Sequence, residues 1–270
     1  MNRTTIVIPC YNEEQRLQVD DFRSYLRNHP AIHLLFVDDG SSDGTFAILS
    51  SISDKHSNAS ALRLPNNVGK AEAVRLGMLQ AGHSNPEFVG FWDADLATPL
   101  RAIQPCLDVF ARRPDLQVVL GSRIPLLGRR IERNSRRRTA AKGFSFLVNR
   151  LMPLRIRDTQ CGAKLFRWSD EAHAAFSRAF SVNWVFDIEV FLRLHSVWNS
   201  DWNKLVYEFP LDEWYEIGGS KLKPTDFVVA FREVVKLAWA YRGTNQRWLQ
   251  LEPSNPVPVG LPEPRLPKAA

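Results

Sequence analysis

The sequence predicts an α/β fold, with a mainly parallel central sheet that helices cover on both faces. Short apolar runs alternate with segments of helical periodicity through the first half of the chain. This β-α alternation is typical of parallel strands joined by crossover helices. Polar, turn-forming motifs follow the apolar runs, and ligands of open parallel sheets bind beyond the carboxyl ends of the strands. We therefore expect the functional residues at that edge.

Five apolar runs have the length of strands and end at turn residues. They cover Thr5–Ile8, Leu34–Val37, Ala61–Leu64, Phe88–Trp92 and Gln117–Leu120. Helical patterns begin near Glu13, Thr45, Gly69 and Pro99. The last of these helices is expected to have Thr98 as its N-cap and Pro99 at its first position.

Beyond residue 120 the alternation is less regular. We expect a helix around Ala140–Leu151, a strand at Ala163–Trp168, a helix around Asp187–Leu194, a strand near Leu205–Phe209 and a last helix from after Pro224-Thr225-Asp226 to about Tyr241. The segment Pro253–Ala270 holds six prolines in 18 residues, which precludes regular structure. We expect one domain over residues 1–252 and a disordered tail over residues 253–270.

Composition indicates a globular protein, since 44% of the 270 residues are hydrophobic. No apolar run approaches the ~18 residues of a spanning helix, and the N-terminus lacks the pattern of a signal peptide. We therefore expect a cytoplasmic protein. The three cysteines, Cys10, Cys106 and Cys161, lack paired spacing, which indicates reduced and buried thiols.

The positive charge is concentrated in one segment. Residues 123–142 hold eight basic residues and one acidic residue, whereas the rest of the chain has 27 basic and 28 acidic residues. The eight are Arg123, Arg129, Arg130, Arg133, Arg136, Arg137, Arg138 and Lys142. Such a local excess suggests a defined anionic partner, and a solvated basic loop is the alternative.

The segment Phe88–Asp95 is an apolar strand followed by two carboxylates, Asp93 and Asp95. In an extended backbone these side chains point the same way. Convergent carboxylates favour Mg²⁺ or Mn²⁺, a metal that usually also binds a diphosphate. A pair of turn aspartates is the alternative.

Three further loops follow predicted strands, and each has a functional and a structural interpretation. Tyr11 could stack on a base, while Asn12 and Glu13 could cap a helix. Asp39 could accept hydrogen bonds from a base or ribose, although turn chemistry explains the glycines and serines after it. Lys70 could lie near an anionic ligand or face solvent. The dinucleotide and P-loop signatures, G-x-G-x-x-G and G-x-x-x-x-G-K-[ST], are absent from the sequence.

Together, the motifs I-V-I-P-C-Y-N-E-E, V-D-D-G-S-S-D-G-T, N-V-G-K and D-A-D, in this order, resemble an inverting family 2 glycosyltransferase of the GT-A fold. Three later segments resemble the dolichyl-phosphate β-glucosyltransferase group within that family. They are D-T-Q-C-G-A-K-L-F from Asp158, W-V-F-D-I-E from Trp184 and W-Y-E-I-G-G-S-K from Trp214. The resemblance covers roughly residues 4–242.

The resemblance implies roles for individual residues. The nucleotide sugar would be bound by Pro9, Tyr11, Asn12, Glu13, Asp39, Gly69, Lys70 and Asp93. Asp95 and Asp93 would hold the Mg²⁺ or Mn²⁺, and Asp158 would be the catalytic residue that faces the reacting sugar. The acceptor would be bound by Arg123, Arg138, Ser220 and Lys221. Residues 1–122 would thus form a nucleotide-sugar-binding half and residues 123–252 an acceptor-binding half.

The resemblance also implies the reaction. We expect transfer of glucose from UDP-glucose to a polyprenyl phosphate, with peripheral attachment to the cytoplasmic face of an anionic membrane and with no nucleic acid partner. One alternative is a soluble glycosyltransferase with a hydroxyl acceptor, for which Asp158, Asp187 or Glu189 would be the base. Another is a nucleotide-sugar-binding protein without turnover.

Two features depart from the dolichyl-phosphate group. Its members carry an N-terminal membrane helix, whereas we expect none in this chain, and Asn183 stands where an Arg would precede Trp184. The segment Gly143–Met152 could instead lie on lipid, helped by apolar residues of the last helix. These are Phe227, Val228, Phe231, Val234, Val235 and Trp239. For the last helix we expect packing onto the sheet rather than lipid contact.

Overall fold

A computed structural model describes residues 4–132, 135–217 and 224–242 of the chain. These residues form two compact units. The described part of the first unit comprises residues 4–96 and 163–177, and that of the second comprises 97–132, 135–162, 178–217 and 224–242. The expected Pro-rich tail, residues 253–270, lies outside the described residues.

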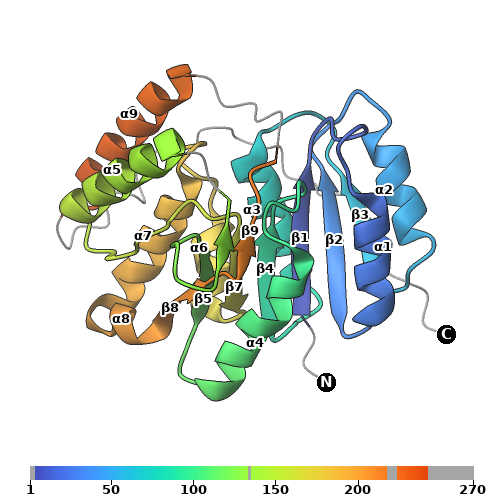
Figure 1. The fold of residues 1–270 in the computed structure, drawn as a ribbon, viewed down its shortest axis with the longest axis horizontal. Coiled ribbons are helices and arrows are strands. Elements are labelled where there is room, and N and C mark those ends of the chain that lie inside the picture. The colour runs from blue at the N-terminus through green and yellow to red at the C-terminus, as the bar shows by residue number, and fades with distance from the viewer. Residues whose placement is uncertain (1–3, 133–134, 218–223, 243–270) are drawn as a thin grey trace. The chain divides into compact units, whose positions relative to one another are not determined.

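The first unit has five strands in the order β3-β2-β1-β4-β7 (Figure 1). They are β1 (Thr4–Cys10), β2 (Ile32–Asp38), β3 (Ala59–Arg63), β4 (Phe88–Trp92) and β7 (Ala163–Arg167). The helices are α1 (Val19–Asn28), α2 (Thr45–Ser53), α3 (Lys70–Gly82) and α6 (Asp170–Ser177). Strands β1 to β4 pair in parallel, whereas β7 runs antiparallel to β4. The loops after β1, β2, β3 and β4 therefore lie at one edge of the sheet.

Helices cover both faces of this sheet, as the alternation of side chains along β2 shows. Phe36 of β2 packs edge-to-face against Phe22 of α1, with 5.2 Å between the ring centroids. The next residue, Val37, points to the opposite face because successive strand side chains alternate. There it lies with Val7 of β1 against Gly77 of α3. The predicted α/β class with a mainly parallel sheet is confirmed.

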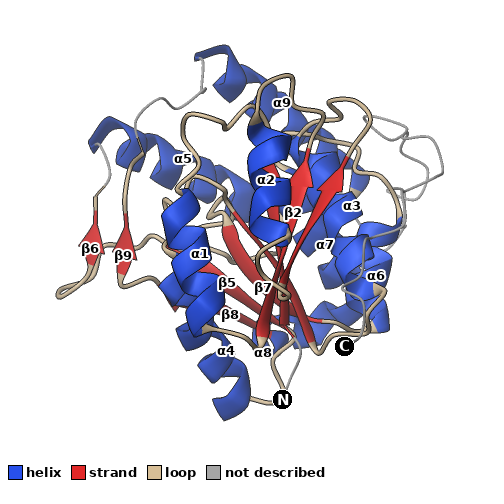
Figure 2. Cartoon of the chain, turned by 90° about the vertical axis from the view of Figure 1, so that its right-hand side faces the viewer, coloured by secondary structure: helices blue, strands red, loops and turns tan. Residues whose placement is uncertain are grey.

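The second unit contains two strand pairs. Strand β5 (Val118–Ser122) pairs in parallel with β8 (Val206–Pro210), and the short β6 (Arg130–Ile131) pairs in parallel with β9 (Glu213–Trp214). Figure 2 shows β6 and β9 as a separate ribbon. The helices are η1 (Leu100–Ala102), α4 (Ile103–Arg112), α5 (Ser135–Leu151), α7 (Phe186–Trp198), η2 (Asn199–Asp201), α8 (Trp202–Leu205) and α9 (Pro224–Ala240).

Several predicted boundaries were wrong for local reasons. Helix α1 begins at Val19 rather than near Glu13, because the Glu13 carbonyl accepts the N–H groups of Arg16 and Leu17 in a separate turn. The helical segment after β4 begins as η1 with Pro99 as its N-cap, since Pro99 is extended with ψ 145°. Thr98, the expected cap, is buried instead.

Other elements agree with the sequence or were not foreseen by it. The three cysteines are free and buried, as predicted. The antiparallel direction of β7, the helix α6 and the β6–β9 pair had no signal in the apolar pattern. The expected strand near Leu205–Phe209 and the helix around Ala140–Leu151 are both present, and the helix begins earlier, at Ser135.

The close approach of α3 to the sheet gives a test of packing with a matched control. A Cβ at Gly77 would lie 2.5 Å from Val7 Cγ1 and 2.8 Å from Val37 Cγ2. We expect Gly77→Ala to lower the free energy of unfolding by about 1–3 kcal/mol, through overpacking. Gly143 of α5 has no heavy atom within 4 Å of such a Cβ. Gly143→Ala should therefore raise stability by up to about 1 kcal/mol, by helix propensity. Urea unfolding that shows both variants shifted in the same direction would contradict this packing.

Candidate functional site

The first two loops at the carboxyl edge of the first unit are bound to each other. Asn12, which has a φ of +50°, donates its N–H to Ser41 Oγ and accepts the Ser42 N–H through Oδ1. The Glu13 N–H is donated to Thr45 Oγ1, at 2.8 Å. Asn12 and Glu13 thus join two loops and cap no helix. Tyr11, at the same edge, is 39% exposed and presents a ring on which a base could stack.

Asp39 connects the second loop with the third. Its Oδ1 accepts the Val68 N–H at 2.7 Å and its Oδ2 accepts the Gly69 N–H at 2.9 Å. Burial raises the pKa of Asp39 to about 6, although these two hydrogen bonds act in the opposite direction. Gly69 has a φ of +90° and precedes the first residue of α3, Lys70. The carboxylate therefore fixes the conformation from which Lys70 projects.

The fourth loop places Lys70 against the first carboxylate of D-A-D. Lys70 Nζ donates to Asp93 Oδ1 at 2.5 Å. The strand ends at Trp92, and Asp93 to Leu96 form a turn in which the Leu96 N–H is donated to the Asp93 carbonyl. The extended backbone expected for Asp93 and Asp95 is therefore wrong. Both side chains are nevertheless half-buried, while Ala94 between them is buried.

The residues of this turn suit a divalent cation of the Mg²⁺ or Mn²⁺ type. Asp93 and Asp95 supply carboxylate oxygens, the donors that such cations prefer. Within the described ranges, the chain has no group of three or more His, Cys, Asp or Glu side chains that could hold a metal. Two carboxylates match a Mg²⁺ site that takes its remaining ligands from substrate phosphates and water. Gln18 Nε2 donates to the Asp95 carbonyl and so holds the turn.

The second unit has its own cluster of charged groups around Asp158. Arg123 donates three hydrogen bonds to this carboxylate, from its backbone N–H, from Nε and from Nη2, at 2.9, 2.7 and 2.7 Å. The guanidinium carbon lies 5.3 Å from the ring centroid of Trp214, a cation-π distance. The residue expected to be catalytic and a residue expected to bind the acceptor thus form one ion pair.

Glu208 of β8 supports this pair and was not singled out from the sequence. Its Oε1 accepts the N–H groups of Arg157 and Asp158, both at 2.9 Å. Burial, followed by the nearby Asp158, raises the pKa of Glu208 above its ordinary value. A lone acidic residue inside the apolar strand Val206–Pro210 was the available signal. We infer that Glu208 positions Asp158.

The basic segment is less uniformly charged than the sequence indicated, because the fold supplies carboxylates from other segments. Arg129 forms an ion pair with Asp212, and Arg123 forms one with Asp158. Arg130 Nε lies 2.8 Å from Glu132, the acidic residue of the segment itself. Lys142 is exposed on α5. The side chain of Arg138 lies outside the described residues, as do Ser220 and Lys221, so their expected acceptor contacts stay predictions.

Among the described residues, no helix is both long enough and apolar enough to cross a bilayer.

This arrangement of strand-end loops agrees with the comparison of the chain with known families. The family model described as "Glycosyl transferase family 2" matches residues 5–171. The chain belongs to this family and is a glycosyltransferase.

Several curated proteins that are similar to this chain share the name dolichyl-phosphate beta-glucosyltransferase. The chain is 31% identical over 251 residues to a dolichyl-phosphate beta-glucosyltransferase of Trichomonas vaginalis, with 88% of this chain and 72% of the relative covered. It is 34% identical over 239 residues to the dolichyl-phosphate beta-glucosyltransferase of Homo sapiens, with 82% and 69% covered. The predicted resemblance to this group is confirmed.

Solved structures agree on the fold. The glucosyl-3-phosphoglycerate synthase of Mycobacterium tuberculosis has a TM-score of 0.62 and 18% identity, with 90% of this chain and 81% of that chain covered. The mannosyltransferase PcManGT of Pyrobaculum calidifontis, solved with GDP-Man and Mn²⁺, has a TM-score of 0.58 and 16% identity, with 87% and 64% covered. At these identities the likeness shows the GT-A fold.

The raised pKa of Asp39 predicts a pH dependence of stability. The folded state holds the Asp39 proton more tightly than the unfolded state, so this residue's contribution to stability is greatest below its ordinary pKa and is lost as pH rises through about 6. As pH rises from 4 to 7, the unfolding free energy of the wild type should therefore decrease relative to that of Asp39→Asn, by at most about 3 kcal/mol. Urea unfolding of both proteins across this range measures it. A relative increase with pH would contradict the assignment.

The Glu208 contacts predict a contrast between two substitutions. Glu208→Ala leaves the N–H groups of Arg157 and Asp158 without their acceptor, so we expect a loss of about 1–3 kcal/mol in unfolding free energy. Glu208→Gln keeps an acceptor oxygen at the same place and should cost less. Equal losses of unfolding free energy in chemical denaturation would contradict the expectation that an acceptor oxygen at this place is enough to satisfy the two N–H groups.

Proposed function

We propose that this protein is a metal-dependent, inverting glucosyltransferase that transfers glucose from UDP-glucose to a polyprenyl phosphate. Four loops at the carboxyl edge of the first unit are the observation that supports a nucleotide-sugar site. The names of the curated relatives support the glucosyl group and the lipid phosphate acceptor.

The first unit would bind the nucleotide sugar. Tyr11 would stack on the uracil, and Asp39 would hold the third loop in place while Pro9, Asn12 and Glu13 line the first. Gly69 has no side chain at the start of α3, where the diphosphate would approach the helix N-terminus. A divalent cation held by Asp95 and Asp93 would offset the charge that develops on the leaving diphosphate.

Lys70 would add a second positive charge at the same place. Lys70 Nζ donates a hydrogen bond to Asp93, so this ammonium group is held in position before any substrate binds. A charge that needs no reorientation during the reaction stabilises the leaving group most effectively. A single displacement from the opposite side would invert the anomeric carbon, and α-linked UDP-glucose would give a β-linked product.

The acceptor would need positive charge more than it needs a base. A phosphate monoester has a second pKa of ~6 and is largely a dianion at neutral pH. We propose that Arg123 and Arg138 bind this phosphate and that Asp158, held by three Arg123 hydrogen bonds, orients the sugar or stabilises its positive charge. Ser220 and Lys221 would add acceptor contacts.

The hydroxyl-acceptor alternative has less support, because one of its three candidate bases is committed to the core. Glu189 is buried and pairs with Arg193 at 2.8 Å. Its Oε2 also accepts the N–H and the hydroxyl of Ser181. Glu189 therefore stabilises the fold and is not available to take a proton from an acceptor.

The proposal is tested with Asp95→Asn, an isosteric change, and with Asp20→Asn, a fully exposed control. We expect Asp95→Asn to lower transfer on the order of 100-fold or more, as the loss of one charge-stabilising group does elsewhere. The control should be unaffected. Radiolabel from UDP-glucose is followed into the organic phase with Mn²⁺ and a detergent-solubilised polyprenyl phosphate. Electron paramagnetic resonance of Mn²⁺ with UDP measures metal binding separately.

Three outcomes would contradict the proposal. Unchanged transfer by Asp95→Asn would remove the metal role. Label found only in water-soluble product would indicate a hydroxyl acceptor. UDP binding without any transfer would indicate a protein that binds nucleotide sugars without turnover.

A further inference from the structure

Helix α9 exposes a continuous ridge of large apolar side chains. Val228, Phe231, Val235 and Trp239 are 62%, 52%, 45% and 59% exposed. Their spacings of three, four and four residues place them on one side of the helix. For these four of the six apolar residues named from the sequence, the expected packing onto the sheet is wrong. Val234 is buried, and the side chain of Phe227 lies outside the described residues. We refer to these four side chains as the α9 ridge.

The opposite side of α9 packs on the rest of the second unit. Val234, Leu237 and Ala240 are fully buried. Glu233 accepts the N–H groups of three successive residues, Asn183, Trp184 and Val185, at 3.0, 2.9 and 3.1 Å. These contacts set the rotation of the helix about its axis, so the ridge points away from the unit that α9 packs on.

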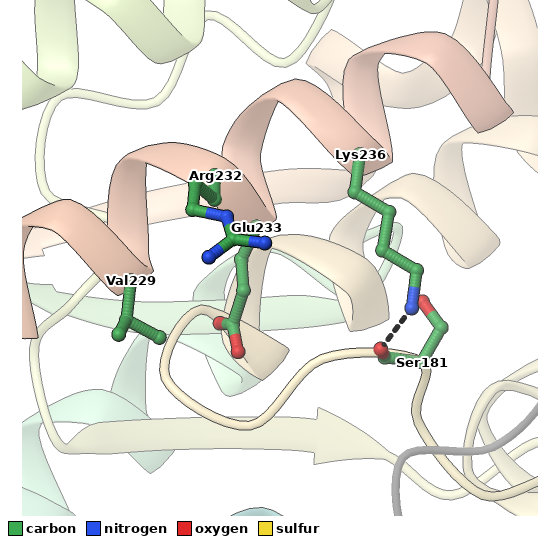
Figure 3. Close-up of a pocket in the computed structure, with 5 residues that line it drawn as sticks. All are labelled: Ser181, Val229, Arg232, Glu233 and Lys236. Carbon is green, nitrogen blue, oxygen red and sulfur yellow. Dashed lines mark hydrogen bonds between the residues drawn. The ribbon is translucent and has the colours of Figure 1, made fainter.

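Cations flank the α9 ridge. Arg232 and Lys236 lie one turn apart and line a cavity of about 300 Å³ together with Ser181, Val229 and Glu233 (Figure 3). Lys236 Nζ donates to the Ser181 carbonyl at 2.6 Å, and its charge is not cancelled by this neutral partner. Glu233 is the sole acidic residue from Val228 to Arg242, and its carboxylate is turned toward the backbone of residues 183–185. The exposed side of α9 is therefore apolar and positively charged.

Helix α5 has a second surface of the same kind. Phe146 is 74% exposed, and Lys142 and Arg150 lie one turn before and after it. All three are exposed and share a helix face because they are spaced by four residues. In both views α5 and α9 lie at the upper end of the second unit (Figures 1 and 2).

We propose that α9 is a membrane-docking helix, whose ridge inserts among the head groups of an anionic lipid surface while Arg232 and Lys236 contact lipid phosphates. A helix that is apolar on both sides needs a second apolar environment. Charge complementarity selects an anionic bilayer, because basic residues beside an apolar helix face are typical of interfacial helices. The inference rests on the proposed function only for the location of the acceptor.

The experiment measures co-sedimentation of the full chain with vesicles of phosphatidylcholine, alone or with 30% phosphatidylglycerol, without any sugar donor. The wild type should bind the anionic vesicles more strongly. Phe231→Gln with Trp239→Gln should weaken binding at least about tenfold, since both side chains lose burial in lipid. Arg232→Ala should weaken it about fivefold, and only on anionic vesicles. Val197→Gln, which changes a 57% exposed valine on α7, is the matched control and should bind like wild type.

Two results would overturn the proposal. One is equal vesicle binding by the wild type and the double ridge variant, including the absence of binding by both. The other is light scattering that shows a wild-type dimer and a monomeric ridge variant, which would assign the ridge to a second copy of the chain.

Transfer to a detergent-solubilised acceptor separates this inference from the proposed function. The double ridge variant should keep wild-type transfer in detergent and lose it with acceptor embedded in vesicles. Vesicle binding without any transfer would leave the docking helix in place and contradict the proposed reaction. Transfer that is equal in both assays would contradict the docking helix and leave the reaction in place.

Discussion

The contact between the Asp39 carboxylate and two backbone N–H groups is the interaction on which the polar edge of the first unit depends. Parallel pairing brings four loops to one edge, but it ends at Asp38 and Arg63. The third loop must then be held by side chains. Asp39 takes the N–H groups of Val68 and Gly69, directly before α3 begins. The position of Lys70 follows from this contact.

Each unit contains a carboxylate, buried or half-buried, that accepts two backbone N–H groups of a loop. A buried carboxylate is costly unless hydrogen bonds or cations satisfy it. Asp39 is satisfied by the backbone of the third loop, and Glu208 by the backbone of Arg157 and Asp158. Both have raised pKa values because burial outweighs these bonds. Buried carboxylates with shifted pKa values are common at functional sites, where they hold loops in a defined position.

The fold and the motif loops could be predicted because their signals are local. Apolar runs bounded by turn residues located β1, β2 and β4 closely, and the order of the motifs indicated the family. The sequence left turn aspartates as the alternative at Asp93 and Asp95 and could not decide for it, because the turn at Asp93–Leu96 depends on a positive φ at Leu96 and on the Gln18 contact from another segment. Likewise, Asp158 and Asp212 neutralise part of the basic segment only after folding. Charge counted along the chain overestimates such a patch.

Helix α9 shows where sequence periodicity stops being informative. Its apolar residues occur on both sides, and the pattern alone does not say which side the protein covers. In the structure a polar contact determines which side is covered. Glu233 accepts three N–H groups from the residues just before α7, and these hydrogen bonds orient α9. Once that side is fixed, Phe231 and Trp239 must face outward. The surface of the protein then carries an apolar ridge next to Arg232. Exposing these side chains to water is unfavourable, and insertion into a lipid interface would remove that unfavourable free energy.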